Sequence, residues 1–226
     1  SPESPIFHKS EILYNLDRAR ASIRKNRHVV IMEGFGDVLA ANRAGVMNVV
    51  GTMGTSLTQQ HITKLKRLVN QITICYDGDN AGFEAAKRAA ILLNDAKFQV
   101  EIAILPDKLD PDDYIKRYGP ENFVDKILGK PHAYIAFMMM HAKRGKNFQF
   151  ENDTLQYLQE VLEQLVGKTS PIERDLYIRQ LASETNISQE AIYAQFRRIE
   201  ADTIKQHKKQ PVMPKELVAA PIEVRK

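Results

Sequence analysis

The sequence predicts an α/β fold in which a parallel sheet of four strands is flanked by helices and followed by an all-helical subdomain. Two patterns support this prediction. Four short apolar runs alternate with helical patterns up to Gly119, and beyond that residue only helical periodicity continues. Apolar strands that alternate with helices are typical of βαβ units, whose strands are parallel and buried. The four runs cover residues 29–32, 47–50, 72–76 and 100–105.

The opening segment, residues 1–27, contains no strand pattern. A helix is expected from about Ser10, with Ile12, Leu13, Leu16 and Ile23 on one apolar side and several arginines on the other. We interpret this segment as the end of an upstream subdomain. The basic residues of this helix are most simply a solvated face.

Each strand of the expected sheet leads into a helix with its own signal. Gly45 ends the first helix, and Ile62, Leu65 and Val69 give the second an apolar face. Alanines in the third, between Ala81 and Ala90, allow close packing on the sheet. The fourth helix follows the acidic segment 110–113. The predicted α/β domain therefore covers residues 28–119.

Residues 120–205 are predicted to form a helical bundle. Leucines 155, 158, 162 and 165 make one stripe, and Ser170 and Glu173 form a capping box with Pro171 at the first helical position. A further helix is expected near Ser188. Residues 206–226 contain three prolines among mixed charges and are expected to be a flexible linker.

Composition restricts the class of protein. The chain has 226 residues and a net charge of +4 although many acids are committed to one region, which favours an anionic partner. Cys75 is the only cysteine and lies in an apolar strand, so a disulfide framework and a zinc site built on cysteine pairs are excluded. No apolar run reaches the ~20 residues of a membrane span, and no signal peptide is evident, so we expect a cytoplasmic protein that does not enter a membrane.

Six carboxylates follow three of the four strands. Because the carboxyl ends of parallel strands meet at one edge of a sheet, all six are expected in one cleft. Like charges ~4 Å apart repel by about 4 kcal/mol at an effective dielectric near 20, and a bound Mg²⁺ or Mn²⁺ would remove that cost. The six are Glu33, Asp37, Asp77, Asp79, Asp110 and Asp112.

Simpler interpretations remain open for each cluster. Asp79 could only cap a helix, and residues 110–113 could be an ordinary acidic turn. Gly54 and Thr55, in a glycine-rich loop after the second strand, could contact a phosphate through backbone N–H groups, although such loops are more often structural. The three clusters together are harder to explain without a metal.

The motif order resembles the Toprim domain of bacterial DnaG-type primases over about residues 5–119. The matching segments are EGFGD at 33–37, GTMGTS at 51–56, YDGDNAG at 76–82 and LPDKLDPDDYI at 105–115. The resemblance implies Glu33, Asp77 and Asp79 as primary metal ligands and catalytic residues. It adds Asp37, Asp110 and Asp112 to the site, and it implies that Lys9 faces the nucleic acid or nucleotide.

The resemblance also implies an activity: metal-dependent nucleotidyl transfer that makes RNA primers from NTPs on a single-stranded DNA template. Two or more Mg²⁺ or Mn²⁺ ions are expected, with no zinc in this segment. The replicative helicase is expected to bind through a domain beyond the C-terminus. The alternatives are another Toprim enzyme, either a nuclease or a topoisomerase, and a non-catalytic helicase-binding module. A phosphatase with an Asp-x-Asp nucleophile fits poorly, because its signature should end the first strand.

Overall fold

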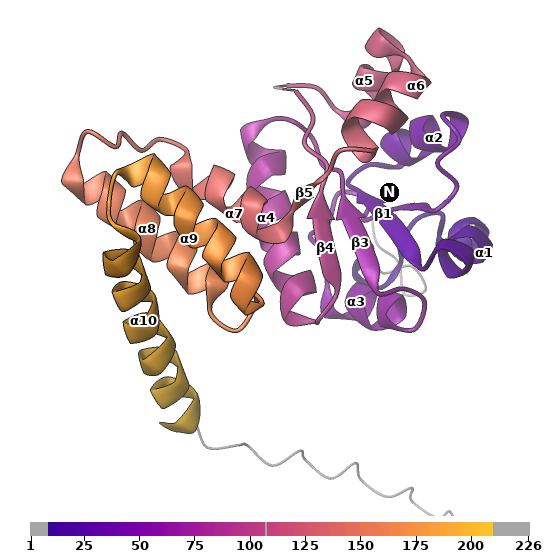
Figure 1. The fold of residues 1–226 in the computed structure, drawn as a ribbon. Helices are drawn as coiled ribbons and strands as arrows, with labels where there is room; N and C mark the ends of the chain where they lie inside the picture. Colours follow the sequence, from indigo (N-terminus) through magenta and orange to yellow (C-terminus); the bar gives the residue numbers. More distant parts are fainter. Residues whose placement is uncertain (1–8, 107, 210–226) are drawn as a thin grey trace, which may run out of the picture. The chain divides into compact units, whose positions relative to one another are not determined.

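The computed structural model describes residues 9–106 and 108–209, and the chain divides into two compact units, Ser1–Arg144 and Gly145–Lys226. The first unit contains a mixed sheet with helices packed against it (Figure 1). The second unit is helical. The predicted fold class, an α/β domain followed by helices, is confirmed.

The sheet has the strand order β2-β1-β3-β4-β5. The first four strands are β1 (His28–Met32), β2 (Val49–Gly51), β3 (Gln71–Ile74) and β4 (Gln99–Ile102), and they pair in parallel. In this register Ile31 of β1 lies opposite Ile74 of β3, and Ile74 lies opposite Ile102 of β4. Their carboxyl ends therefore meet at one edge of the sheet, as predicted.

The prediction of a four-stranded sheet was incomplete. A fifth strand, β5 (His132–Ala133), pairs antiparallel with β4. With only two residues it is too short to show the alternation that identifies a strand in sequence. At the opposite edge, Tyr14 exchanges two backbone hydrogen bonds with Gly51, of 2.8 and 3.2 Å, and so covers part of the open side of β2.

Helices connect the strands. They are α1 (Leu16–Asn26), α2 (Phe35–Arg43), α3 (Gln59–Lys66), α4 (Asn80–Asp95), α5 (Pro111–Tyr118), α6 (Pro120–Asn122) and α7 (Tyr134–Lys143), with a 3₁₀ turn η1 (Lys9–Glu11) and a π-helical segment η2 (Phe123–Leu128). The expected helix from Ser10 was wrong in its start. Asn15 adopts a left-handed conformation, with φ of 67°, while Tyr14 pairs with the sheet, so the helix begins only at Leu16.

One core cluster explains why the first unit extends past the last parallel strand. Val30 and Met32 of β1 pack with Val38 of α2, and Phe123 and Ile127 of η2 belong to the same cluster. The strand pattern ends near Gly119 as expected, but the compact unit continues to Arg144. Cys75 is buried in this cluster, which agrees with its predicted role as a small core residue.

The second unit consists of α8 (Glu151–Leu165), α9 (Pro171–Thr185) and α10 (Gln189–Lys209). The predicted capping box is present, since the Ser170 hydroxyl accepts from the Glu173 N–H at 3.3 Å and Glu173 Oε2 accepts from the Ser170 N–H at 2.8 Å. α10 continues to Lys209, beyond the expected start of the linker at residue 206; residues 210–226 lie outside the described part. In residues 9–106 and 108–209, no helix is long and apolar enough to cross a membrane.

Candidate metal-binding active site

Glu33 is the first residue after β1, and Gly34 is the N-cap of α2. Its Oε1 atom is buried and has no hydrogen-bond partner among the described residues. The pKa of Glu33 is raised, first because burial disfavours the charged form and then because Asp79 and Asp37 are negative, whereas a backbone hydrogen bond from Asp77 and the charge of Arg88 lower it. The carboxyl end of β1 thus presents a partly buried carboxylate, and its Oε1 atom can still accept a hydrogen bond or bind a cation.

Asp37 lies in the first turn of α2 and is buried. Its Oδ2 accepts the Gly34 N–H at 3.1 Å, which closes the turn between β1 and α2. Burial, followed by the charges of Asp110 and Asp77, raises its pKa to about 6. A methyl group on Gly34 would lie 2.6 Å from Asp37 Oδ2, so a larger residue there would displace the Asp37 carboxylate.

Asp77 and Asp79 follow β3 and take different positions. Asp77 Oδ1 is buried without a partner, and burial together with the charges of Glu33, Asp110 and Asp79 raises the Asp77 pKa to about 6. Asp79 is the N-cap of α4, and its Oδ1 accepts the Gly82 N–H at 2.7 Å. The capping interpretation therefore holds for one oxygen of Asp79 and leaves the other available.

Asp110 and Asp112 open α5. Asp110 is the N-cap, and its Oδ1 accepts the Asp113 N–H at 2.7 Å. Asp112 Oδ2 forms an ion pair with Lys116 at 2.5 Å, while its backbone N–H donates to Asp37. Asp110 acts electrostatically on both Asp37 and Asp77, so the structure brings it toward the other acids. The Asp112 carboxylate is instead engaged by a lysine.

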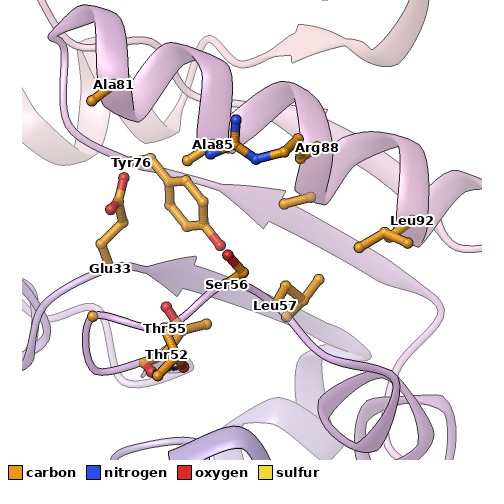
Figure 2. Close-up of a pocket in the computed structure, with 12 residues that line it drawn as sticks. Glu33, Thr52, Thr55, Ser56, Leu57, Tyr76, Ala81, Ala85, Arg88 and Leu92 are labelled. Carbon is orange, nitrogen blue, oxygen red and sulfur yellow. Dashed lines mark hydrogen bonds between the residues drawn. The ribbon is translucent and has the colours of Figure 1, made fainter.

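A pocket of about 330 Å³ opens beside Glu33 (Figure 2). Gly54 and Thr55 line it, in the loop after β2, where the Gly54 N–H donates to the Glu33 carbonyl oxygen at 3.2 Å and the Thr55 hydroxyl donates to the Thr52 carbonyl oxygen at 2.8 Å. Tyr76 and Arg88 also line the pocket. In Figure 2 the Tyr76 hydroxyl points toward Ser56, and the Arg88 side chain extends along α4 toward Ala85.

The sequence analysis missed Arg88 and Tyr76. Arg88 has a recognisable signal, because it follows Ala81 and Ala85 at helical spacing and therefore shares their face of α4. Tyr76 lies inside an apolar run and offers no such signal. Lys9 starts η1, but its side chain lies outside the described part of the structure, so its role stays a prediction.

The donor set suits a hard divalent cation. Two buried carboxylate oxygens lack a partner within the described part of the chain, and burial followed by the charges of the other acids raises the pKa values of Glu33, Asp37 and Asp77. A cation such as Mg²⁺ would pair the free oxygens and offset the repulsion. As the side chains are placed, no three His, Cys, Asp or Glu residues of the described segments form a group that could hold a metal ion. Binding would therefore require side-chain rotation.

Comparison with known proteins identifies this arrangement. A Toprim-like family model matches residues 30–115, and a model described as the DnaB-helicase binding domain of primase matches residues 135–190. DNA primases of Halalkalibacterium halodurans and Geobacillus stearothermophilus are each 43% identical to the chain, over 192 and 205 residues that cover 85% and 91% of it. The chain belongs to the DnaG-type primase family. It spans about a third of the length of these relatives, 32% and 34% respectively.

Solved primase structures share this fold. A DNA primase domain from Pseudomonas aeruginosa is 29% identical with a TM-score of 0.67, over 89% of this chain and 62% of that one. A DnaG primase catalytic domain bound to single-stranded DNA is 27% identical with a TM-score of 0.65, over 84% and 61%. The predicted family is thus confirmed. The helicase-binding family model matches inside the chain, whereas the sequence analysis placed helicase contact beyond the C-terminus.

Proposed function

We propose that this chain carries the metal-dependent active site of a primase, a nucleotidyltransferase that makes RNA primers from NTPs on a single-stranded DNA template. The observation that carries the proposal is the pair of buried, unpartnered oxygens, Glu33 Oε1 and Asp77 Oδ1, at the ends of the neighbouring strands β1 and β3. Buried polar atoms almost always have partners, and an exception indicates a missing ligand or a catalytic role. The DNA primase relatives indicate which reaction such a site serves. We further propose that this reaction takes place in the cytoplasm, as expected from the sequence.

In this proposal Glu33, Asp77 and Asp79 are the primary ligands of Mg²⁺ or Mn²⁺, with two or more ions in the site. Asp37 and Asp110 complete the acidic site, and Asp112, whose Oδ2 is paired with Lys116, joins it through its other oxygen or by leaving that lysine. When bound, such ions favour loss of the proton of the attacking hydroxyl and neutralise charge on phosphate oxygens. Gly54 and Thr55 would contact the triphosphate from the pocket beside Glu33.

The protein's own contacts orient these groups before any ligand binds. Helix α4 fixes Asp79 through the Gly82 N–H, and the β1–α2 turn fixes Asp37 through the Gly34 N–H. Both acids are therefore held at helix N-termini, where the backbone dipoles favour negative charge. Asp79 and Asp37 are thus oriented before metal binds, and the side-chain rotation that binding requires concerns the other acids.

Metal binding tests the site directly. Calorimetric titration of the chain with Mn²⁺ should show binding that the double variant Asp77→Asn, Asp79→Asn abolishes while its circular dichroism stays native. Glu121→Gln, an exposed acid at the start of α6, is the matched control and should bind like the wild type. Unchanged Mn²⁺ binding in the double variant would refute the ligand assignment.

Primer synthesis tests the reaction, and it must be measured in the full-length protein. Glu33→Gln should abolish incorporation of NTPs on a single-stranded DNA template while leaving template binding in place. Synthesis at the wild-type rate by Glu33→Gln would exclude this site as the catalytic one.

We also propose that the segment 135–190 contributes to binding of the replicative helicase. The supporting observation is an apolar face on α9, where Ile172 and Leu176 are 76% and 59% exposed at the i, i+4 spacing that puts side chains on one side of a helix. Exposed apolar side chains of this size are typical of protein interfaces. The double variant Ile172→Ser, Leu176→Ser should weaken helicase binding in full-length primase. Leu155→Ser is the control and should leave helicase binding unchanged, because Leu155 is 52% exposed but lies on α8.

A further inference from the structure

Phe35 is an exposed aromatic ring next to the acidic site. It is the first residue of α2, two positions after Glu33, and it is 63% exposed. Leu39, one turn further along α2, is 41% exposed. An aromatic ring of this size usually contributes to a core or an interface, because its burial is favourable by about 1.5–3 kcal/mol. The acidic site is thus bordered by apolar surface that the described chain does not cover.

The ring is held in place by its neighbours. Gly34, immediately before it, is tied to Asp37 by the 3.1 Å hydrogen bond that closes the turn. Tyr14 contacts Phe35 in a T-shaped arrangement, with ring centroids 6.3 Å apart and an angle of 70°. Tyr14 is in turn fixed by its two backbone bonds to Gly51. Phe35 therefore keeps a defined orientation while most of its surface stays open.

Charged residues near the ring indicate what would cover it. Glu33 and Asp37, two positions before and after Phe35 in the chain, would attract phosphates once they hold metal. Tyr14, which contacts the ring, lies two residues before α1, whose arginines 18, 20 and 24 are exposed. A partner that combines phosphates with a flat apolar group matches this combination of residues. Single-stranded nucleic acid has this chemistry, and bases stack on aromatic side chains in proteins that bind it.

We propose that Phe35, braced by Tyr14, is a stacking platform for a base of the single-stranded nucleic acid bound at the acidic site. The inference rests on the proposed function, because the acids attract phosphates only with metal bound. Stacking on one aromatic side chain is worth about 1–3 kcal/mol per base, which corresponds to roughly 5- to 150-fold in affinity. The platform would fix a nucleotide beside the reacting groups without selecting its identity.

The composition of the chain permits a direct test, because it contains no tryptophan. Phe35→Trp therefore places a single indole at the proposed platform. Its fluorescence should be quenched, in the presence of Mn²⁺, by a short DNA or RNA oligonucleotide but not by an abasic strand of equal length and charge. Comparison of the DNA and RNA strands distinguishes template from primer as the stacked strand. Phe150→Trp, at a position that is also 63% exposed but lies in the second unit, is the matched control and should not respond.

Affinity gives an independent readout. With a fluorescent oligonucleotide, Phe35→Ala should weaken binding by about 5- to 150-fold, and Phe35→Tyr should restore most of the loss. Leu39→Ala, on the same face of α2, should change the affinity less than twofold. The side chains are exposed, so all these variants should keep the wild-type melting temperature.

Three results with this chain would overturn the proposal. They are equal quenching by the abasic strand, oligonucleotide binding without quenching of Phe35→Trp, and absence of oligonucleotide binding up to millimolar concentration. A fall in melting temperature without a fall in affinity for Phe35→Ala in full-length primase would also overturn it, because the ring would then pack against another part of the polypeptide. Mn²⁺ titration of the same samples separates these failures from failure of the metal site.

Discussion

Neutralising Asp77 should stabilise the metal-free protein. Burial and the charge of Glu33 raise its pKa to about 6, so at pH 7.5 its carboxylate is ionised in surroundings that disfavour the charge. Asp77→Asn keeps the size of the side chain and removes this cost. We expect a gain of about 1 kcal/mol, or roughly 2–4 °C in melting temperature for a protein of this size. Scanning calorimetry in EDTA measures it.

Asp79 provides the contrast, since its carboxylate caps α4. Both aspartates follow β3, but the 2.7 Å hydrogen bond from the Gly82 N–H to Asp79 Oδ1 distinguishes Asp79 from Asp77. Asp79→Ala should lose about 1 kcal/mol, the usual cost of removing an N-cap. A clear fall in melting temperature for Asp77→Asn in EDTA would instead make Asp77 structural.

His28 should make folding stability depend on pH. The Asn48 amide, which also donates to the His28 carbonyl oxygen, lies 3.1 Å from His28 Nδ1, and Nε2 lies 2.8 Å from the Thr73 hydroxyl. Nδ1 must therefore accept a hydrogen bond, which only a neutral ring can do. Burial lowers the His28 pKa, against the opposing charge of Glu101.

The sign of the pH effect follows from that shift. Below the ordinary value of 6.5 the unfolded chain binds a proton that the folded chain resists, so stability is lost as pH falls through this range. Asp37 and Asp77, whose raised pKa values lie near 6, act in the opposite direction over the same range, so the His28 contribution is measured as a difference between wild type and His28→Gln. In urea denaturation at pH 7.5 and pH 5.5, His28→Gln should lose less stability on acidification, or gain more, than the wild type, and an identical response would assign the effect to other groups.

Individual site residues could be predicted from the sequence, but most of their side-chain partners could not. Glu33, Asp77 and Asp79 were identifiable because each follows an apolar strand. The Lys116 ion pair of Asp112 was not predicted, although its i, i+4 spacing is visible in sequence. The partners of His28 were not predictable, because Asn48 and Thr73 come from other strands and loops, 20 and 45 residues away.

Two glycines, Gly78 and Gly36, differ in whether their surroundings leave room for a side chain. At Gly78, between the two aspartates, an added methyl group would lie 2.2 Å from the Pro106 carbonyl oxygen. The Gly78 N–H also donates a hydrogen bond to the Leu109 carbonyl oxygen at 2.8 Å. At Gly36, in the first turn of α2, an added methyl group would meet nothing within 4 Å.

These surroundings give opposite expectations for the same substitution. Gly78→Ala should destabilise the protein by about 1–3 kcal/mol, because backbone must move to admit the methyl group. Gly36→Ala should instead stabilise it by about 0.5–1 kcal/mol, because alanine restricts the unfolded chain and favours the helix. Chemical denaturation of both variants tests the pair. Equal effects of the two substitutions on stability would mean that the backbone at Gly78 and the backbone at Pro106 separate easily.

Elements with strong local signals were predicted well. The four parallel strands have apolar runs, and α9 has its capping box and proline. The start of α1 was missed because Tyr14 pairs with Gly51, 37 positions further along the chain, which local periodicity cannot reveal. The two-residue strand β5 likewise depends on its partner β4.

At the scale of the whole molecule, the division into two units separates the proposed functions. All six acids of the site lie in the first unit, Ser1–Arg144, which has its own sheet and core cluster. The exposed pair on α9 lies in the second unit. The predicted boundary between the α/β domain and the helical bundle lies at Gly119, where the strands stop. The first compact unit continues to Arg144, and Phe123 and Ile127 of η2 belong to its core cluster.

This division predicts that metal binding survives removal of the second unit. A chain ending at Arg144 keeps every proposed ligand together with Phe123 and Ile127, which a chain ending at Gly119 would lose from the core. The longer truncation should bind Mn²⁺ with the affinity of the parent chain, within twofold by calorimetry. The shorter one should lose the core contribution of two buried side chains, about 3–6 kcal/mol, and with it a stable site. Equal Mn²⁺ binding by both truncations would show that the sheet and its acids fold without η2, and loss of binding by the longer one would mean that the site depends on the helices after Arg144.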